Sequence, residues 1–473
     1  MSDSPANRAG RPVLSFRAQN PKRGDSSHRY EVFYLQTEFI ILLIMLGSFI
    51  VFAVLRFPIS ISLIVAAVLG ALCAGFGFPL ARLVEGAFGY LDAIMIIATA
   101  MIFMRSIERS GLLKTLANAI ARLFHNKPYL LLAFMTLFIM FAGMITGSST
   151  ASVLTSGAIA YPVLTQLGLD KKRAGAIIAM SAIFGMIAPP VNIPVMIIGQ
   201  GVDMPYMGFT YPLLWITIPL AFLTSFLFGG KYIHRIPKES IEKGTGGFLV
   251  YAPFILLIVL MLLEELRVLD LGMPLVFLLC ALCATVTGKR FDFFKSSVEA
   301  IGDSLNILSI LVGVGMFIQV MTMTGVRGFV VGSFVSIPQS VLFLTMAVGI
   351  PLFGAVSSFG SASVLGVPFL LSFLSGDVIV VTAALSMLAG LGDMVPPTAL
   401  AGIFAAQVVG EKSYFKIFAR SLISVAITIV ACVFVVLYSK HVAALPPWLF
   451  WVVSGGFLGV LSLIKGKEAP KVV

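Results

Sequence analysis

GMITGSSTASVLTSG, residues 143–157, places seven Ser or Thr side chains and three glycines in a chain otherwise rich in Leu, Ile, Val, Phe and Met. Such a segment needs a structural reason, because a membrane interior offers no water to satisfy irregular backbone. The chain is 59% hydrophobic and 11% charged, whereas soluble domains carry about 25% charged residues. The composition therefore excludes a soluble globular protein and indicates an integral membrane protein.

Apolar runs of about 20 residues recur between Phe39 and Leu463. They lack the alternation of a membrane barrel, so they predict an all-α polytopic membrane protein. Residues 1–37 are polar and basic and predict a flexible N-terminal tail. Residues 439–473 are expected to hold a last transmembrane helix and a C-terminal tail in the cytoplasm.

The chain contains an internal repeat, with the first copy at 38–247 and the second at 248–438. Four anchors recur in order, at offsets that fall from 216 to 207 residues as small loop deletions would produce. They pair Pro58 with Pro274, Gly111 with Gly325, TASVL (150–154) with SASVL (361–365), and APPVNIP (188–194) with VPPTALA (395–401). Four matches in the same order predict a duplicated architecture.

Loop charges indicate that the two copies are inverted relative to each other. Lys- and Arg-rich loops mark the cytoplasmic side, and they occur at 171–173, 231–243, 289–295, 411–416 and after Lys465. The acidic loop 264–270 is expected outside. Corresponding segments then face opposite sides, as in many secondary transporters. The symmetry places the N-terminus outside, although the basic tail argues against this.

Each copy contains two interrupted segments. Re-entrant helical hairpins are expected at about 130–165 and 340–375, because apolar stretches of about 12–18 residues on either side of the Ser/Gly clusters are short for separate spans. Broken helices are expected at about 174–205 and 378–409, where Pro-Pro removes amide donors and frees carbonyls. A lone Pro-Pro could be a kink, and a lone hydroxyl cluster could be interhelical packing. Their pairing in both halves favours an ion and substrate site at the membrane midplane.

Asp393 is an acidic residue three positions before Pro396 in an apolar segment. An acid at membrane depth indicates function, here either cation binding or proton transfer. The alternative is local capping beside a water-filled vestibule. Arg105 and Glu108 are one helical turn apart, so we expect them to pair near an interface.

Other chemistries lack their motifs. Cys280 and Cys283 form CxxC within an apolar segment that has no His nearby, so we interpret them as packing residues. No Walker A, HExxH or Ser-His-Asp arrangement is visible, so we expect neither an enzyme nor an organic cofactor. The net charge of +11 is explained by cytoplasmic loops, so nucleic acid is not an expected partner.

These motifs resemble the large membrane (permease) subunit of tripartite ATP-independent periplasmic (TRAP) transporters, in the ion transporter superfamily. The first copy carries the resemblance, through residues 143–157 and then YPVLTQLGLDKKRAGAIIAMSAIFGMIAPPVNIPVMIIGQG (161–201). The second copy departs from the family pattern: AVSSFGSASVLG (355–366) lacks the usual acidic residue and paired threonines, and Asp393 stands where the family is usually apolar.

The resemblance implies sodium-driven import of small organic acids, such as dicarboxylates or sugar acids, across the bacterial inner membrane. A transport domain would move like an elevator against a scaffold. The implied partners are a small four-helix membrane subunit, a periplasmic substrate-binding protein, a small organic anion and membrane lipid.

The resemblance also assigns residues by position. Sodium would be bound by Ser148, Ser149, Thr150, Pro190 and Asn192 in the first copy, and by Ser358, Gly360, Ser361, Pro397 and Thr398 in the second. Substrate would contact Ser149, Ser152, Asn192, Ser361 and Ser363.

Two alternatives remain open. The chain could be a stand-alone ion- or proton-coupled carrier of organic anions that needs no binding protein, with Asp393 as the coupling acid. It could also be a membrane-embedded enzyme or a passive channel, although an enzyme would be expected to cluster more titratable groups at membrane depth.

Overall fold

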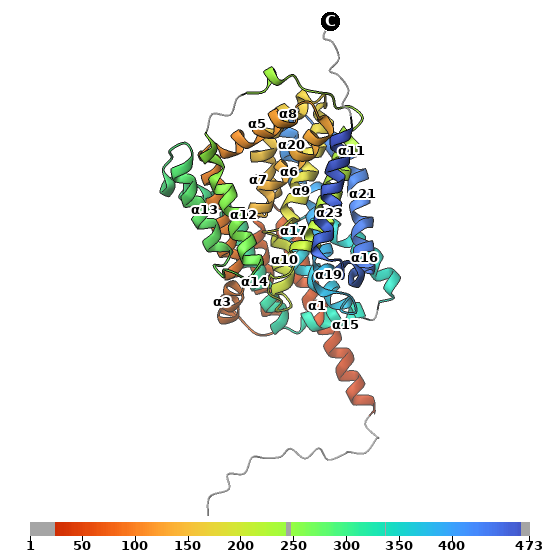
Figure 1. The fold of residues 1–473 in the computed structure, drawn as a ribbon. Coiled ribbons are helices and arrows are strands. Elements are labelled where there is room, and N and C mark those ends of the chain that lie inside the picture. Colours follow the sequence, from red (N-terminus) through yellow and green to blue (C-terminus); the bar gives the residue numbers. More distant parts are fainter. Residues whose placement is uncertain (1–23, 243–246, 336, 465–473) are drawn as a thin grey trace, which may run out of the picture.

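The computed structural model describes residues 24–242, 247–335 and 337–464, and every regular element within these ranges is helical. Five of these helices are long and apolar enough to cross a membrane, or six if the bent pair α3 (Leu80–Phe88) and α4 (Leu91–Arg109) counts as one span. Several shorter apolar helices pack among them (Figure 1). The protein is therefore an all-α polytopic membrane protein, as its composition predicted.

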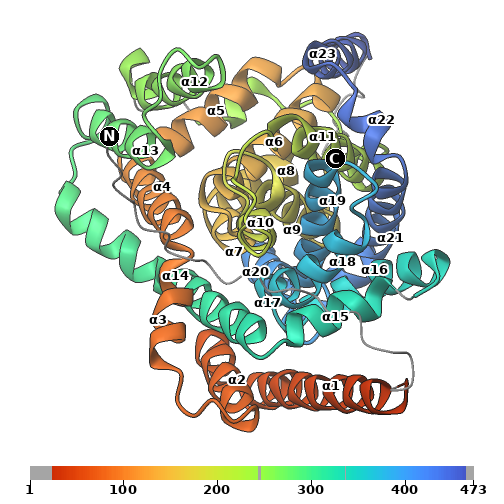
Figure 2. The ribbon, with the colours of Figure 1, turned by 90° about the horizontal axis from the view of Figure 1, so that it is seen from below.

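The helices form two layers, which Figure 2 shows most clearly. The outer layer curves along one side of the molecule, because α14 packs against α2, α3 and α4, and α13 packs against α4. Its elements are α1 (Gly24–Val54), α2 (Ile59–Cys73), α3, α4, α5 (Leu112–Phe124), α12 (Ala252–Glu265), α13 (Met273–Thr287), α14 (Phe293–Met323) and α15 (Val326–Val335).

The inner layer fills the middle of the molecule and contains the interrupted segments of both copies. Its first half consists of α6 (Pro128–Thr146), α7 (Ser149–Ser152), η1 (Val153–Gly157), α8 (Ala158–Gln166), α9 (Lys171–Ile187), α10 (Ile193–Gln200) and α11 (Thr210–Gly229). Its second half consists of α16 (Gln339–Gly354), α17 (Ser358–Ser361), η4 (Ala362–Gly366), α18 (Val367–Ser372), α19 (Val378–Gly390), η5 (Leu391–Met394), α20 (Leu400–Val409) and α21 (Phe415–Leu437). The chain continues through α22 (Ser439–Ala443) to α23 (Pro447–Leu463), which packs against α6 and α11.

The two halves of the inner layer share local details. Each hairpin contains a capping serine, a four-residue α-helical turn and a five-residue π-helical turn. Each broken helix contains a cis Pro-Pro peptide, at Pro189-Pro190 and Pro396-Pro397. The caps pair Ser148 with Ser357, which differs by two residues from the register that TASVL and SASVL predicted. In the structure SSTAS (148–152) corresponds to SSFGS (357–361), because the capping serine fixes where each turn begins.

The outer layer departs from the symmetry between the copies. In the first copy α3 and α4 meet at 49°, whereas the 31 residues of α14 form one helix. The bent pair packs closely on α14: a Cβ atom at Gly86 would lie 2.4 Å from the carbonyl oxygen of Gly315. Two glycines therefore allow the backbones to approach where the bend meets the straight helix.

The basic loops within the described residues, at 171–173, 231–242, 289–295 and 411–416, gather at one end of the molecule, the upper end in Figure 1. Backbone and side-chain hydrogen bonds join Lys289 to Ser110 (3.0 Å), Ile236 to His125 (3.2 Å), His234 to Leu167 (3.0 Å) and Lys171 to Gly410 (3.2 Å). The first hairpin opens toward this end and the second toward the other, which matches the inverted arrangement of the repeats.

Residues 24–37 of the predicted N-terminal tail form the first turns of α1. Residues 1–23 lie outside the described residues, as do residues 465–473 of the predicted cytoplasmic C-terminal tail.

Candidate functional site

The first hairpin reverses direction at Gly147 and Ser148. Gly147 adopts a left-handed conformation with φ of 61°, where a Cβ atom would lie 2.7 Å from Ile193 Cγ1. The Ser148 hydroxyl then accepts the Ala151 N–H at 3.2 Å and caps the returning helix. Ser152 donates its hydroxyl back to the Ile139 carbonyl at 2.5 Å, so the two arms lie side by side.

The second hairpin repeats this construction. Ser357 accepts the Gly360 N–H at 3.0 Å, and Ser361 donates to the Ile350 carbonyl at 2.7 Å. Ser363 donates to the Gly360 carbonyl at 2.9 Å, within its own turn. Ser361 and Ser152 therefore use their hydroxyls to hold the hairpin arms together, and their predicted contacts with substrate stay a prediction.

Asn192 organises the first broken helix. Its side-chain oxygen accepts the Val195 N–H at 3.0 Å and caps α10. Its amide nitrogen donates to the Ile187 carbonyl at 2.7 Å and to the Ser386 hydroxyl at 3.1 Å. The residue is fully buried, so one side chain satisfies both ends of the break and links α9 to α19.

The second break is tied to the second hairpin. Thr398 donates its hydroxyl to the Ala355 carbonyl at 2.7 Å, and its backbone N–H points to the same oxygen at 3.2 Å. Ala399 follows in a left-handed conformation before α20 begins. In the first break the Pro190 carbonyl accepts the Tyr206 hydroxyl at 3.0 Å.

Glycines allow the backbone of each hairpin to lie close to its broken helix. A Cβ atom at Gly185 of α9 would lie 2.4 Å from the Met140 carbonyl of α6, and one at Gly143 would lie 2.7 Å from the Met186 nitrogen. In the second half, a Cβ atom at Gly392 would lie 2.2 Å from the Gly354 carbonyl carbon. Both hairpin tips are thereby held against the proline breaks.

Asp393 lies where the two hairpin tips meet. It belongs to η5, just before the second break, and is 5% exposed. The Ser149 hydroxyl of the first tip donates to its carboxylate, and Ser358 of the second tip lines the same cavity. One carboxyl group thus links the first tip to the second break, although its sequence position has no counterpart in the first copy.

A cavity of about 800 Å³ opens beside these tips, between the two layers. Six of the predicted site residues line it: Ser148, Ser149, Thr150, Ser358, Thr398 and Asp393. The remaining predicted residues do not line it: Ser152, Pro190, Asn192, Gly360, Ser361, Ser363 and Pro397. The hydroxyls of the two tips therefore share one cavity, while Asn192 and the prolines of the two breaks do not line it.

The outer wall of the cavity contains residues that the sequence did not assign to the site. Arg105 donates to Glu108 at 2.9 Å, which confirms the expected pair, and it also donates to Asp303 of α14. All three side chains line the cavity, together with Asn306. The three-residue spacing predicted the pair, but Asp303 lies 198 positions from Arg105, and nothing in the sequence indicated their meeting.

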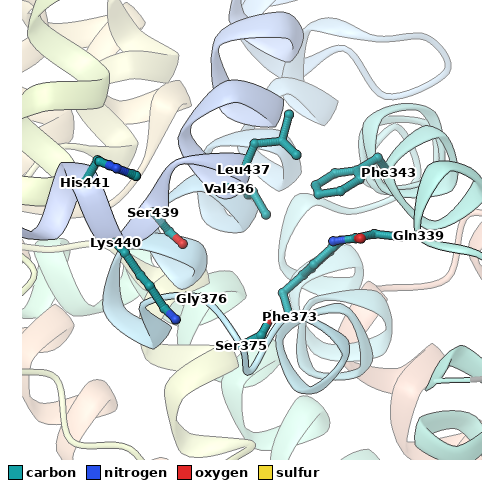
Figure 3. Close-up of a pocket in the computed structure, with 10 residues that line it drawn as sticks. All are labelled: Gln339, Phe343, Phe373, Ser375, Gly376, Val436, Leu437, Ser439, Lys440 and His441. Carbon is teal, nitrogen blue, oxygen red and sulfur yellow. The ribbon is translucent and has the colours of Figure 1, made fainter.

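A second cavity, of about 320 Å³, lies at the other end of the inner layer, where the second hairpin opens. Figure 3 shows Lys440, Ser439 and Ser375 around it, with Phe343 and Phe373 on one side. None of the predicted site residues lines this cavity. The larger cavity is therefore the candidate functional site.

Within the described ranges, no group of three or more His, Cys, Asp or Glu side chains could hold a metal ion. The oxygens available near the tips belong to hydroxyls, the Asp393 carboxylate and backbone carbonyls. Hard oxygens of this kind suit small cations such as sodium better than thiolate-preferring metals.

Comparisons with known proteins give a family and a fold. A family model described as "Tripartite ATP-independent periplasmic transporter, DctM component" matches residues 46–442. The crystal structure of the Alcanivorax borkumensis YdaH transporter superposes with a TM-score of 0.57 at 15% identity, covering 76% of this chain and 88% of that chain. Neisseria gonorrhoeae MtrF, from a class of antimetabolite efflux pumps, superposes with a TM-score of 0.52 at 13% identity, covering 76% and 83%. At these identities the two structures show similarity of fold alone. No curated individual protein matches the sequence.

Proposed function

The chain belongs to the DctM family, the large membrane subunits of TRAP-type secondary transporters, and we propose that it imports a small organic acid together with sodium. The observation that carries this proposal is the convergence of both hairpin tips and Asp393 on one cavity. Ser149 of the first copy hydrogen-bonds to Asp393 of the second, and Ser149, Ser358 and Asp393 all line that cavity. Such a midplane meeting of interrupted helices is where secondary transporters bind substrate and coupling ions.

Two symmetric sodium sites are part of this proposal. The first would use Ser148, Ser149, Thr150, Pro190 and Asn192; the second would use Ser358, Gly360, Ser361, Pro397 and Thr398. Hydroxyl oxygens at the tips and carbonyl oxygens at the proline breaks are suitable ligands for a hard cation. Asn192 would act by fixing the break, because its own polar atoms are all engaged within the protein.

The two-layer arrangement supports an elevator mechanism. The inner layer carries both hairpins and both breaks, so it would be the transport domain, and the outer layer would be the scaffold. The cavity between the layers would then be the solute path in this conformation. Because the basic loops mark the cytoplasmic side, that end and the C-terminus would face the cytoplasm of a bacterial inner membrane.

The family implies a small membrane subunit and a periplasmic binding protein as partners. We propose that the small subunit has four helices and packs on the outer layer, whose α2 and α14 expose large apolar side chains such as Leu72 and Val298. The binding protein would deliver the organic acid at the end opposite to the basic loops.

Uptake by proteoliposomes tests the proposed function. Vesicles containing the chain and its small subunit would receive a radiolabelled organic-acid panel, with an inward sodium gradient and with binding protein added or omitted. We expect sodium-driven accumulation that needs the binding protein. Equal uptake with and without a gradient would contradict coupled transport and would support a passive channel.

A stand-alone proton-coupled carrier of organic anions is the second candidate. Asp393 favours it, because a buried carboxyl with a hydroxyl partner could take up and release a proton. In the same vesicles, this candidate predicts uptake without binding protein, driven by an inward proton gradient in sodium-free potassium buffer.

A further inference from the structure

We infer that the transported solute carries a protonated amine as well as its acid group, and that the ammonium pairs with Asp393. This inference rests on the proposed function and narrows its substrate class to zwitterionic solutes, such as amino acids. It follows from the charges that line the cavity, from the partners of Arg105 and from the surroundings of Asp393.

The described lining of the cavity is acidic. Its charged side chains are one arginine and three carboxylates: Arg105, Glu108, Asp303 and Asp393. Both walls contribute, since Asp393 belongs to the inner layer and the other three belong to the outer layer. A cavity built for a simple dicarboxylate would be expected to show the opposite charge, because like charges across a binding site cost affinity.

Arg105 is already engaged by two carboxylates. It donates to Glu108 on its own helix at 2.9 Å and to Asp303 on α14. Arg109 and Glu299, at 2.6 Å, pair α4 with α14 nearby. A solute carboxylate would have to displace Glu108 or Asp303 from Arg105. This arginine therefore links α4 to α14 and offers no free cationic group to an anion.

Asp393 has a hydroxyl partner but no cationic one within the described part of the chain. The Ser149 hydroxyl donates to it, and no ion pair there includes it. A carboxylate can accept about four hydrogen bonds, so capacity remains for a further donor. A buried charge needs a counter-charge, and an ammonium from the solute would supply both the charge and the donors.

The rest of the cavity suits an amino acid of modest size. Thr150 and Thr398 add hydroxyls on the inner wall, while Met101, Met104 and Ile307 present apolar surface on the outer wall. The amine would sit at the tips, the acid group would meet the hydroxyls and the coupling ions, and the carbon skeleton would face the outer layer.

Binding of matched solute pairs to the purified full-length chain in lipid nanodiscs tests this inference. Aspartate would be compared with succinate, glutamate with glutarate, and β-alanine with propionate, since each pair differs by one amine. Titrations in sodium chloride would be repeated in potassium chloride, which avoids organic cations. We expect at least tenfold tighter binding of the amine-bearing member in sodium.

The variant Asp393→Asn should lower this preference to less than threefold, while Asp270→Asn, in the exposed α12–α13 loop, should leave it unchanged. Thermal unfolding would establish that both variants fold. If one does not, the preference of the wild-type protein for the amine-bearing solutes still decides the inference. Absence of an amine preference in all three pairs would overturn the inference.

The uptake assay separates the two levels of proposal. Gradient-driven accumulation of the amine-free acids, without preference for the amines, would overturn the inference and leave the transporter proposal intact. Proton-driven uptake of succinate that Asp393→Asn abolishes would also overturn it, by making Asp393 a proton carrier. Lack of gradient-driven uptake of any solute would instead count against the proposed function.

Discussion

Asn192 carries three hydrogen bonds from one buried side chain. It caps α10 through Val195 and donates to Ile187 and Ser386. These bonds hold the two ends of the first proline break and attach it to α19.

Replacing Asn192 should therefore lower the free energy of unfolding more than replacing its partner Ser386 does. We expect Asn192→Ala to lower the free energy of unfolding by about 2–3 kcal/mol, through loss of the cap and of two buried donors. Ser386→Ala removes only one of these bonds and should cost about 1 kcal/mol. Thermal unfolding in detergent would measure both; equal effects would show that the cap and the Ile187 bond contribute little.

Composition made several single residues conspicuous in the sequence. The hydroxyl cluster at the first tip, Asn192 after Pro-Pro, and Asp393 in an apolar segment all stood out. Their partners could not be predicted, because Ser386 lies 194 positions from Asn192 and Asp393 lies 244 positions from Ser149. A local sequence pattern does not show which distant residues contact each other in the fold.

Among the elements, the hairpins depend on close contacts between glycines. Gly354 of α16 faces Gly392 of η5 so closely that a Cβ atom at Gly392 would overlap backbone atoms. The same device joins α6 to α9 through Gly143 and Gly185. Small residues of this kind let helix backbones approach within membranes.

The substitution Gly392→Ala should separate the second hairpin from its broken helix. Its methyl group would meet the Gly354 backbone at 2.2 Å, so we expect a loss of about 1–3 kcal/mol in the free energy of unfolding. Gly349→Ala is the matched control, because Gly349 lies in α16 with only Thr345 Cγ2 at 3.8 Å. Thermal unfolding midpoints would compare them, and an equal or smaller loss at Gly392 would contradict this account of the contact.

The sequence predicted some features of the helices, such as their proline breaks, and missed others. Proline and glycine clusters indicated where helices break, since they act on the backbone locally. TASVL and SASVL misaligned the two hairpins by two residues, because their residues are alike whereas the capping serines Ser148 and Ser357 set the turns. The bend between α3 and α4 was not predicted, and it packs on α14 through Gly86 and Gly315.

At the scale of the molecule, two hydrogen bonds attach α10 to the outer layer. The Tyr90 hydroxyl donates to the Ile197 carbonyl at 3.0 Å, and the Arg327 guanidinium donates to the Gly201 carbonyl. Both acceptors lie at the C-terminal end of α10, and the Ile197 carbonyl also accepts the Gly201 N–H at 3.1 Å. The elevator movement proposed above requires these two bonds to break.

Removing one of these bonds should favour other arrangements of the layers. We expect Tyr90→Phe to lower the population of the present arrangement relative to the alternative by about fivefold, as loss of one hydrogen bond of about 1 kcal/mol implies. Electron–electron distance measurements between spin labels at Leu72 (α2) and Ile423 (α21), in a cysteine-free background, would report this.

Tyr161→Phe is the control for this experiment, because the Tyr161 hydroxyl donates to the Val409 carbonyl within the inner layer, at 3.2 Å. It should leave the distance distribution unchanged. A shift of similar size in both variants would argue that the layers do not move as separate bodies.

The overall architecture followed from composition, the repeat and loop charge, because these act along the whole chain. The outer wall of the cavity did not follow, since Arg105 and Asp303 meet only once α4 and α14 are packed together. The acidic character of the cavity is therefore a property of the assembled layers.

The most direct test of the central claim is a double-mutant cycle on the two hairpin tips, read as initial rates of gradient-driven uptake in proteoliposomes. If Ser149 and Ser358 act on one shared Asp393, the variants Ser149→Ala and Ser358→Ala should each slow uptake, and the double variant should be little slower than the worse single one. Effects that multiply independently, or uptake unchanged in all variants, would contradict a single site built by both tips.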